Sequence, residues 1–415
     1  MVDVLIAGGG IAGSSLAILL GRQGLEVELF ERGQFPKEKP CGEGLMPAGV
    51  AVLKRLGLAD AVGGVPFYGV RYHFGQHTAE GRFPFLPGLP VFGRGQRRRH
   101  LDQVLFHAAS RTPGVTAHCG VSVDGPLLEH GRVNGFVVEG QPRRARLTVA
   151  ADGVRSQMRQ LLGLDVPVVR KRFAVRTHLR LTPGREQPPW VDVFVSRGHE
   201  LYVTPLPHRE VLVAVLANNG ALHEPLEHAF HRWRCSEPVL SSLLEGAEQM
   251  TPLLCTAPLA SRARSGVAPG IVLLGDAAGF PDPITGGGIT QALMTAELLG
   301  KFVKRYFRGP EDWLWDFERE RRRMLADYRL LTQMVLWLAD HPVVAERLIG
   351  ARISWLWANT ENKPDLSAYT LSTDCCVSKD RFSARAMPGV ATQSSKNPAA
   401  IRLQFCRDSE YMGPP

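Results

Sequence analysis

The sequence predicts a mixed α/β fold with two parts, a largely parallel sheet flanked by helices and a second, mostly antiparallel sheet. Two observations lead to this prediction. Towards both ends of the first 358 residues, apolar strands alternate with glycine turns and helices, which is the pattern of a parallel sheet. In the middle of the chain, several strand-like segments follow one another with few helices between them, as in an antiparallel sheet.

The chain begins with the pattern of a βαβ unit. Residues 2–7 (VDVLIA) are short, apolar and ended by glycines, as expected of a buried parallel strand. A helix is expected at 11–23, where Gly24 stops it, and residues 26–31 (EVELFE) have the composition of the next strand. Strand, glycine turn, helix and strand together predict one βαβ unit.

Further elements complete a first region at 1–165. Helices are expected at about 47–56 and 101–112. Alternating segments at 121–123 and 133–139, joined by turns that contain glycine, indicate a small antiparallel meander.

A second domain is predicted at 166–260. The segments RFAVRTHLRL, WVDVFVS, ELYVTPLP and EVLVAVLA are rich in β-branched and apolar residues, which favours strands. One helix is expected after them, at about 221–246.

The first domain is predicted to resume at 261–358. An apolar strand at 270–276 (GIVLLGD) is followed by helices at about 287–307, 311–339 and 343–357. From 359 to 415 the chain is rich in Ser, Thr, Asn, Lys and Pro and has no helix or strand repeat. That composition predicts a disordered or loosely attached tail.

Composition narrows the functional class. The formal net charge is +9, but the densest basic cluster, GRGQRRRH at 93–100, has no interleaved aromatic residues and no nucleic-acid motif around it, so no nucleic-acid partner is predicted. The seven cysteines include no CxxC pair, which indicates a reducing, cytoplasmic setting. The apolar start lacks a basic region before it and is therefore not predicted to be a signal peptide. No run is apolar enough to span a membrane, and peripheral membrane contact is left open.

Three motifs carry the chemistry. The first motif is Gly8, Gly10 and Gly13 in G-x-G-x-x-G spacing, with Glu31 at the end of the following strand. This spacing gives a tight turn, lets a pyrophosphate approach the backbone and lets the helix pack on the strand. The helix N-terminus favours phosphate, and the carboxylate is placed to accept hydrogen bonds from an adenosine ribose.

The second and third motifs follow later strands. The second motif is Asp152 and Gly153 in VAADGVRSQMR. The third motif comprises Gly275 and Asp276 at a strand end and Gly287 and Gly288 at a helix start, in VLLGDAAGFPDPITGGGITQAL. An acid at the end of a strand suits a polyol, and a helix start stabilises negative charge on a ligand by about 0.3–2 kcal/mol.

These motifs, in this order, resemble the FAD-dependent oxidoreductases built like para-hydroxybenzoate hydroxylase, and the geranylgeranyl reductase family most closely. The likeness covers about residues 1–345. It implies a Rossmann-type FAD-binding domain and a substrate domain built on the antiparallel sheet. It further implies non-covalent FAD, with NAD(P)H as a transient co-substrate.

The resemblance also implies residue roles. Gly8, Gly10, Gly13 and Glu31 would hold the ADP half of FAD, and Arg98, in RRHLD, is similar to the family's flavin-binding arginine. Asp152 and Gly153 would serve FAD and, in relatives, NAD(P)H. Gly275 would belong to the cofactor site, Asp276 would meet the ribityl chain, and Gly287 and Gly288 would face the pyrimidine edge of the flavin.

Two stretches favour the reductases within this group. Aromatic hydroxylases usually carry a histidine after GDAA, whereas Gly279 stands here, and KPCGEG is similar to a reductase stretch that places Cys41 near the flavin. Two interpretations of Cys41 stay open: a thiol that helps protonate the substrate, or a small residue in a turn. The substrate-pocket motif of the reductases is only partly present, in Tyr202 and Pro207, because His199, Thr204 and Leu206 occupy other positions of that motif.

No metal site is predicted. His228, His231 and Cys235 share one face of the predicted helix, but the sequence supplies no fourth ligand.

The favoured function is an NAD(P)H-dependent FAD oxidoreductase that reduces double bonds of a hydrophobic, isoprenoid- or lipid-like substrate. The alternatives are a FAD-dependent monooxygenase of an aromatic or polyketide-like substrate, and a non-enzymatic binding protein on the same fold. The oligomeric state is not predicted.

Overall fold

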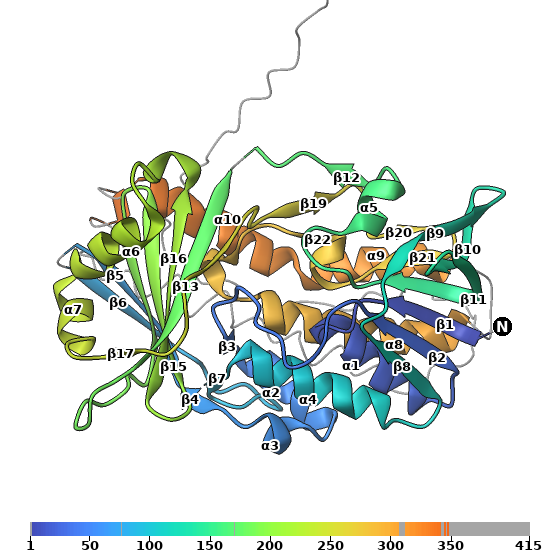
Figure 1. Ribbon diagram of the computed structural model, residues 1–415, viewed down its shortest axis with the longest axis horizontal. Helices are drawn as coiled ribbons and strands as arrows, with labels where there is room; N and C mark the ends of the chain where they lie inside the picture. The colour runs from blue at the N-terminus through green and yellow to red at the C-terminus, as the bar shows by residue number, and fades with distance from the viewer. Residues whose placement is uncertain are drawn as a thin grey trace, which may run out of the picture. The chain divides into compact units, whose positions relative to one another are not determined.

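The computed structural model describes residues 2–75, 77–169, 171–306, 312–341, 344, 345 and 347 (Figure 1). The predicted tail at 359–415 and almost all of the predicted helix at 343–357 lie outside the described residues. All the described residues belong to one compact unit.

The first domain is built on a largely parallel sheet, as predicted. Its strand order is β20-β21-β11-β1-β2-β8, in which only the outermost β20 runs antiparallel to its neighbour. A meander of two antiparallel strands, β9 and β10, extends from β11. The strands are β1 (Val2–Ala7), β2 (Val27–Glu31), β8 (Val115–Cys119), β9 (Val123–Glu129), β10 (Arg132–Val138), β11 (Gln141–Ala150), β20 (Val267–Ala268) and β21 (Ile271–Leu273).

Three helices pack beside one another on one face of this sheet (Figure 1). They are α1 (Ile11–Gly21), α4 (Arg98–Ser110) and α8 (Gly288–Tyr306). Leu16 and Leu20 of α1 share a core with Leu105 of α4 and Leu293 of α8. This core fixes the starts of α1 and α8 at the same edge of the sheet, where strands β1 and β21 end.

The second sheet is mostly antiparallel, as predicted, in the order β17-β13-β16-β15-β14-β5-β6, with β18 also paired to β13. Only the β14–β5 pair is parallel. The strands are β5 (Gly69–Phe74), β6 (His77–Arg82), β13 (Arg172–Arg180), β14 (Val191–Ser196), β15 (His199–Leu206), β16 (Glu210–Asn218), β17 (Glu248–Gln249) and β18 (Leu254–Thr256).

Strands β5 and β6 show where the second sheet departs from the predicted 166–260 range. They come from the region assigned to the first domain, and β5 pairs along the edge strand β14, from Val70 beside Val191 to His73 beside Phe194. The inward residues of β5, including Val70, Tyr72 and Phe74, join the core of the second sheet. This burial of apolar surface explains why β5 and β6 belong to the second sheet although they precede residue 166.

The helices also differ in detail from the sequence prediction. The helix expected at 221–246 is two helices, α6 (Leu226–Cys235) and α7 (Pro238–Leu243), because Pro238 cannot continue the first and instead starts the second. The helix expected at 311–339 is likewise divided, at Leu325, into α9 (Trp313–Met324) and α10 (Ala326–Asp340).

The two faces of the second sheet are covered by different elements. Phe230, Trp233 and Leu240 of α6 and α7 pack on one face, and Val335 and Ala339 of α10 join the core of the other face. The shorter helices are α2 (Pro47–Arg55), α3 (Ala59–Val62) and α5 (Gln157–Leu161).

Two small three-stranded sheets complete the described part of the fold. Their orders are β3-β7-β4 and β12-β19-β22. The strands are β3 (Gly44–Leu45), β4 (Val65–Phe67), β7 (Gly93–Gly95), β12 (Asp165–Val166), β19 (Ser261–Ala263) and β22 (Gly279–Phe280), and three single-turn segments are η1 (Asn219–Ala221), η2 (Gly275–Ala278) and η3 (Pro283–Thr285).

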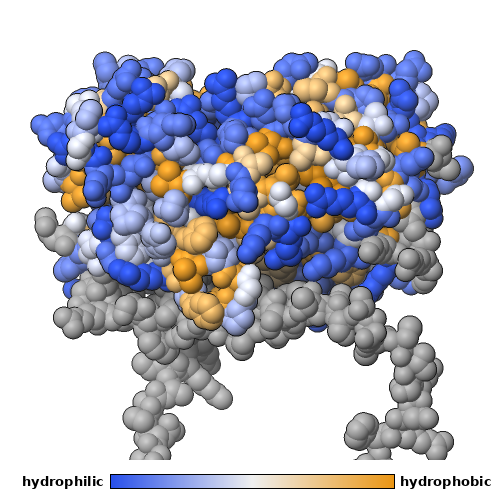
Figure 2. All heavy atoms as spheres, turned by 90° about the horizontal axis from the view of Figure 1, so that it is seen from below, coloured by the Kyte–Doolittle hydropathy of each residue, from blue (hydrophilic) through white to orange (hydrophobic). Residues whose placement is uncertain are grey.

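The surface mixes hydrophilic and apolar groups. On the face shown in Figure 2, hydrophobic residues gather near the centre and are surrounded by hydrophilic ones. Among the most exposed large apolar side chains are Phe85 and Val169, at 79% and 97% exposure. No helix within the described ranges is long and apolar enough to cross a membrane.

Candidate active site

The first motif forms the turn that its glycine spacing predicts. Gly8 follows β1 with φ of +109°, and a Cβ there would overlap the carbonyl oxygen of Ala151. A Cβ on Gly13 would overlap the carbonyl oxygen of Gly8. Both positions therefore require glycine, and the turn brings the chain directly into the N-terminus of α1.

Gly10 leaves the start of α1 open. It caps the helix without any side-chain hydrogen bond, so the first backbone N–H groups are free to bind an anion. The nearest atom to the place of a Cβ on Gly10 is Nζ of Lys39, 3.6 Å away. The open position at Gly10 therefore lies next to the positive charge of Lys39, where a pyrophosphate would approach.

Lys39 is a site residue that the sequence analysis did not assign. Its half-buried ammonium group has no hydrogen-bond or ion-pair partner among the described residues. Burial, assisted by repulsion from Arg98, lowers the pKa of this group. The sequence signal for this residue was its position directly before Pro40 and Cys41, in the stretch that the resemblance places near the flavin.

Glu31 lies at the end of β2 with its side chain buried and well bonded. One carboxylate oxygen accepts from the N–H of Gly9 at 3.0 Å, and the other accepts from the N–H of Gly33 at 2.8 Å and from Lys37 Nζ at 2.6 Å. A carboxylate offers about four acceptor positions, so one remains for a ribose hydroxyl.

The second motif lies against the first. Asp152 follows β11, and the N–H of Ala151 donates to the carbonyl of Ala7 at the end of β1, at 2.7 Å. Oδ2 of Asp152 accepts from the N–H of Met158 at 3.1 Å, whereas Oδ1 is buried without a partner in the described structure. Gly153 has φ of +86° and open space around it, so this turn can approach a ligand closely.

The third motif is held against the other two. Gly275 has φ of +60°, and a Cβ on it would lie 3.1 Å from the Cβ of Ala12 in the first turn of α1. Arg159 of α5 donates to the carbonyl of Ala277 at 3.1 Å and to that of Val154 at 2.8 Å. The buried guanidinium thus ties the loop after β11 to the loop after β21.

Asp276 has a carboxylate that lacks a donor. No hydrogen bond or ion pair reaches its side chain from the residues that the structure describes. Burial raises the pKa of its carboxyl group, and the positive charges of Lys39 and Arg98 oppose this shift. A ligand that offers hydroxyl groups, such as a ribityl chain, would satisfy this acceptor.

Gly287 and Gly288 begin α8 beside the segment that contains Cys41. A Cβ on Gly288 would lie 3.4 Å from the ring of Phe280, and one on Gly287 would lie 2.9 Å from Nε2 of Gln291. The N–H of Met46 donates to Oγ1 of Thr290 in the first turn of α8, at 3.2 Å. Residues 39–46 therefore run from the start of α1 to the start of α8.

Arg98 is buried at the start of α4. Its Nε and Nη2 donate to the two carboxylate oxygens of Asp102 at 2.8 and 2.9 Å. Burial alone would lower the pKa of Arg98, but attraction to Asp102 raises that pKa overall. Two nitrogens of Arg98 are therefore occupied by Asp102, and Cys41 lies near the guanidinium group.

Cys41 lies in a turn between these groups. Its half-buried Sγ accepts from the N–H of Glu43 at 3.4 Å. With Arg98 on one side and Lys39 two residues earlier, the thiol belongs to the cluster formed by the first and third motifs.

Tyr202 and Pro207, the two residues predicted to line a substrate pocket, lie in different surroundings. Tyr202 of β15 is buried, and its hydroxyl donates to the carbonyl of Ile284 in η3 at 2.9 Å. It therefore connects the second sheet to the loop that leads into Gly287. The carbonyl of Pro207 accepts from the N–H of Glu210 within its own hairpin, and among the described residues no hydrogen bond joins Pro207 to the three motifs.

His231 and Cys235 of α6 lie close to each other. Cys235 Sγ lies 3.8 Å from the ring nitrogens of His231. Within the described ranges, no group of three or more His, Cys, Asp or Glu side chains is arranged to hold a metal ion.

The residues of the three motifs fit a bound FAD. The open start of α1, the unpaired cation of Lys39 and the unpaired acceptors of Asp152 and Asp276 are complementary to phosphates and hydroxyl groups. The assignment of individual residues to parts of FAD stays a prediction.

Comparison with known proteins identifies the family. Residues 1–328 match the family described as FAD binding domain. The chain belongs to this family and is a FAD-dependent oxidoreductase, which confirms the resemblance inferred from the three motifs.

Relatives of known activity include oxygenases and reductases. Squalene epoxidase of Schizosaccharomyces pombe is 28% identical over 327 residues, 72% of this chain and 69% of that protein. Menaquinone reductase of Mycolicibacterium smegmatis is 29% identical over 322 residues, 72% of this chain and 76% of that protein.

A solved structure shows the same fold. A flavoprotein/dehydrogenase from Cytophaga hutchinsonii superposes with a TM-score of 0.74 at 22% identity, covering 89% of this chain and 98% of that one. This likeness confirms the predicted combination of a largely parallel and a mostly antiparallel sheet.

Proposed function

We propose that this protein is an NAD(P)H-dependent reductase that saturates carbon–carbon double bonds of a hydrophobic, isoprenoid- or lipid-like substrate. The balanced reaction consumes one NAD(P)H, one proton and one alkene, and forms NAD(P)⁺ and the saturated product. FAD, when bound, supplies the hydride transfer between the nicotinamide and the substrate. The protein must place the substrate, exclude water and provide the proton.

The observation that carries this proposal is the position of Cys41. The thiol lies beside Arg98, in the segment that runs from Lys39 at the start of α1 to Met46 at the start of α8. A thiol placed there can donate its proton to the alkene carbon that does not receive hydride, and can recover a proton from solvent afterwards. Proton transfer from a positioned side chain contributes about 10²–10⁴-fold to a rate.

The relatives support a hydrophobic substrate. The names of these relatives specify squalene, a hydrocarbon, and menaquinone, a quinone with an isoprenoid chain. We infer a substrate of the same general chemistry for this chain.

One relative favours a second candidate. Squalene epoxidase inserts oxygen rather than hydrogen, as its name states. A monooxygenase would consume NAD(P)H, a proton and molecular oxygen, would insert one oxygen atom into the substrate, and would release the other as water. A non-enzymatic role is not retained, because the chain belongs to a family of oxidoreductases.

Rapid-mixing kinetics distinguish the two candidates. The holoenzyme is reduced by NAD(P)H without oxygen and mixed with a panel of isoprenoid lipids, quinones and phenols, and flavin absorbance is followed. A reductase reoxidises its flavin with one of the alkenes in the absence of oxygen. In Cys41→Ser, that step slows by about 10²–10⁴-fold while FAD affinity is unchanged. Strict dependence on oxygen in both proteins overturns the reductase assignment.

A further inference from the structure

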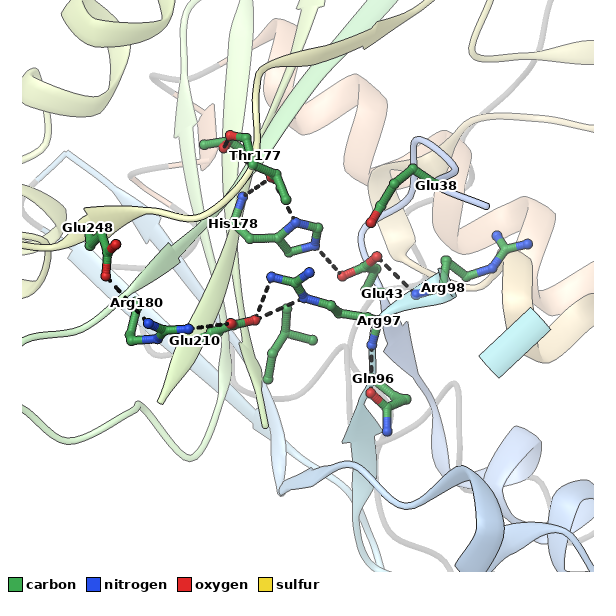
Figure 3. A network of polar contacts seen from close by, with 12 residues as sticks. Glu38, Glu43, Gln96, Arg97, Arg98, Thr177, His178, Arg180, Glu210 and Glu248 are labelled. Atoms are coloured by element: carbon green, nitrogen blue, oxygen red, sulfur yellow. Dashed lines mark hydrogen bonds and ion pairs between the residues drawn. The ribbon is translucent and has the colours of Figure 1, made fainter. Parts of the chain in front are cut away.

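Two fully buried side chains connect the second sheet to the turn that carries Cys41. His178 of β13 and Glu43, two residues after Cys41, approach to 2.8 Å between Nε2 and Oε2 (Figure 3). Neither side chain is exposed to solvent. The other carboxylate oxygen of Glu43 accepts from the N–H of Arg98 at 2.9 Å.

The neighbours of His178 determine which ring nitrogen faces Glu43 as a donor. Nη1 of Arg176 lies 3.1 Å from Nδ1 of His178. Arginine is only a donor, so Nδ1 accepts and the ring hydrogen is on Nε2. Nε2 of His178 therefore donates to Oε2 of Glu43.

This bond supports an unusual backbone conformation. Glu43 has φ of +57°, in the left-handed region that residues other than glycine rarely adopt. Such a conformation costs about 1–3 kcal/mol and persists only where surrounding contacts enforce it. Here, the carboxylate is fixed by donors from β13 and from α4. As a result, the N–H of Glu43 points at Sγ of Cys41, at 3.4 Å.

Further contacts from the same sheet hold the residues around Cys41. Thr204 of β15 donates from Oγ1 to the carbonyl of Gly42 at 2.8 Å. Nη2 of Arg176 donates to Oε2 of Glu38 at 2.5 Å and to the carbonyl of Lys39 at 3.1 Å. The turn is thus held by the second sheet on both sides of the thiol.

We propose that His178 and Glu43 are positioning residues for Cys41. They hold the turn at 41–43 in the conformation that places the thiol beside Arg98, and they couple that placement to the substrate sheet. The catalytic part of this inference rests on the proposed function of Cys41, whereas the positional part does not.

The main test compares His178→Leu with His178→Gln. Leucine removes the donor to Glu43, whereas the amide of glutamine can still supply an N–H. A matched control is His73→Leu, because His73 of β5 makes a similar 2.8 Å contact with Asp192 elsewhere in the same sheet.

The first readout is independent of activity. The rate of iodoacetamide alkylation at Cys41 is measured by peptide mass spectrometry, with the exposed Cys235 of α6 as internal reference. Release of the turn exposes the half-buried thiol. We expect alkylation about tenfold faster in His178→Leu, on the scale of one lost hydrogen bond, and close to wild type in His178→Gln and His73→Leu.

The second readout is flavin reoxidation by the alkene without oxygen. We expect His178→Leu to be about 10²-fold slower, the scale for displacing a reacting group by about 1 Å. Because the two residues act through one thiol, His178→Leu combined with Cys41→Ser should be no slower than Cys41→Ser alone.

The outcomes separate this inference from the proposed function. If Cys41→Ser reoxidises normally, the proposed role of the thiol fails, but a changed alkylation rate in His178→Leu still supports positioning. Unchanged alkylation in folded His178→Leu, or an equal change in His73→Leu, overturns the inference. If His178→Leu does not fold, Thr204→Val provides the same comparison, because it removes only the bond to Gly42 and should also accelerate alkylation.

Discussion

Nζ of Lys39 lies 3.6 Å from the point that a Cβ atom on Gly10 would occupy, at the open N-terminus of α1. The ammonium group has no partner among the described residues, and Gly10 is the glycine that the G-x-G-x-x-G spacing leaves free for a pyrophosphate. We propose that the two residues form the two sides of a phosphate site, one through backbone N–H groups and one through charge.

Lys39→Met should weaken FAD binding by about 10–100-fold, because a hydrogen bond to a charged group contributes about 1.5–3 kcal/mol. The measurement is a titration of the apoprotein with FAD, followed by flavin fluorescence. The control is Lys54→Met, which changes an exposed lysine in the last turn of α2. Equal affinity in the Lys39 variant and wild type would remove the phosphate role.

Glu31→Ala should lower FAD affinity by about 10–100-fold for the same reason. In contrast, Lys37→Met releases one carboxylate oxygen of Glu31 from its 2.6 Å ion pair and should leave affinity unchanged or improve it. The same fluorescence titration decides between them, and a loss of affinity in Lys37→Met alone would assign the ribose contact to the lysine.

Asp276→Asn should stabilise the apoprotein while weakening FAD by about tenfold. Burial raises the pKa of this carboxyl group above its ordinary value of 3.8, so the ionised form is less favourable in the folded chain than in the unfolded chain. Wild-type apoprotein therefore loses stability as pH rises from 3.8 through the raised pKa. Urea unfolding across this range should show the two proteins converging in acid, and a less stable Asn variant at neutral pH would contradict the prediction.

Glu318→Gln should destabilise the fold by about 3 kcal/mol, because it leaves the buried Arg321 without its charged partner. Although burial acts to raise the pKa of Glu318, its hydrogen bonds with Arg321 lower that pKa overall from 4.5. Its contribution is complete above pH 4.5 and is lost as pH falls through the lowered folded pKa.

Urea unfolding measures the loss in Glu318→Gln, with Glu320→Gln on the same helix as control. Glu320 makes only a 3.6 Å pair with the exposed Arg323, so its removal should cost less than about 1 kcal/mol. Equal effects of the two substitutions would show that the buried pair has no special importance.

The cofactor motifs were predictable because their signals are local. Gly8, Gly10 and Gly13 lie between a strand and a helix, and Asp276 follows an apolar strand, so each motif is contained in one short stretch. Parallel strands bring their carboxyl ends to one edge, and the structure accordingly brings these stretches together.

The residues that the sequence did not reveal depend on long-range pairing. Glu43 and His178 meet across 135 positions, through a strand register that no local pattern encodes. Strands β5 and β6 join the second sheet because β5 pairs with β14. Lys39 is recognised as a site residue only from its distance to Gly10. Such contacts follow from tertiary packing, which the periodicity of one segment does not specify.

The most direct test of the reductase assignment is the composition of the product. The holoenzyme is incubated with NAD(P)H and the lipid that reoxidises its flavin, under isotopically labelled oxygen. The mass of the product is then measured by mass spectrometry. The account predicts a product that gains two hydrogen atoms and no labelled oxygen, at a rate that does not change when oxygen is removed. A product that gains one labelled oxygen atom would contradict it and assign the protein to the monooxygenases.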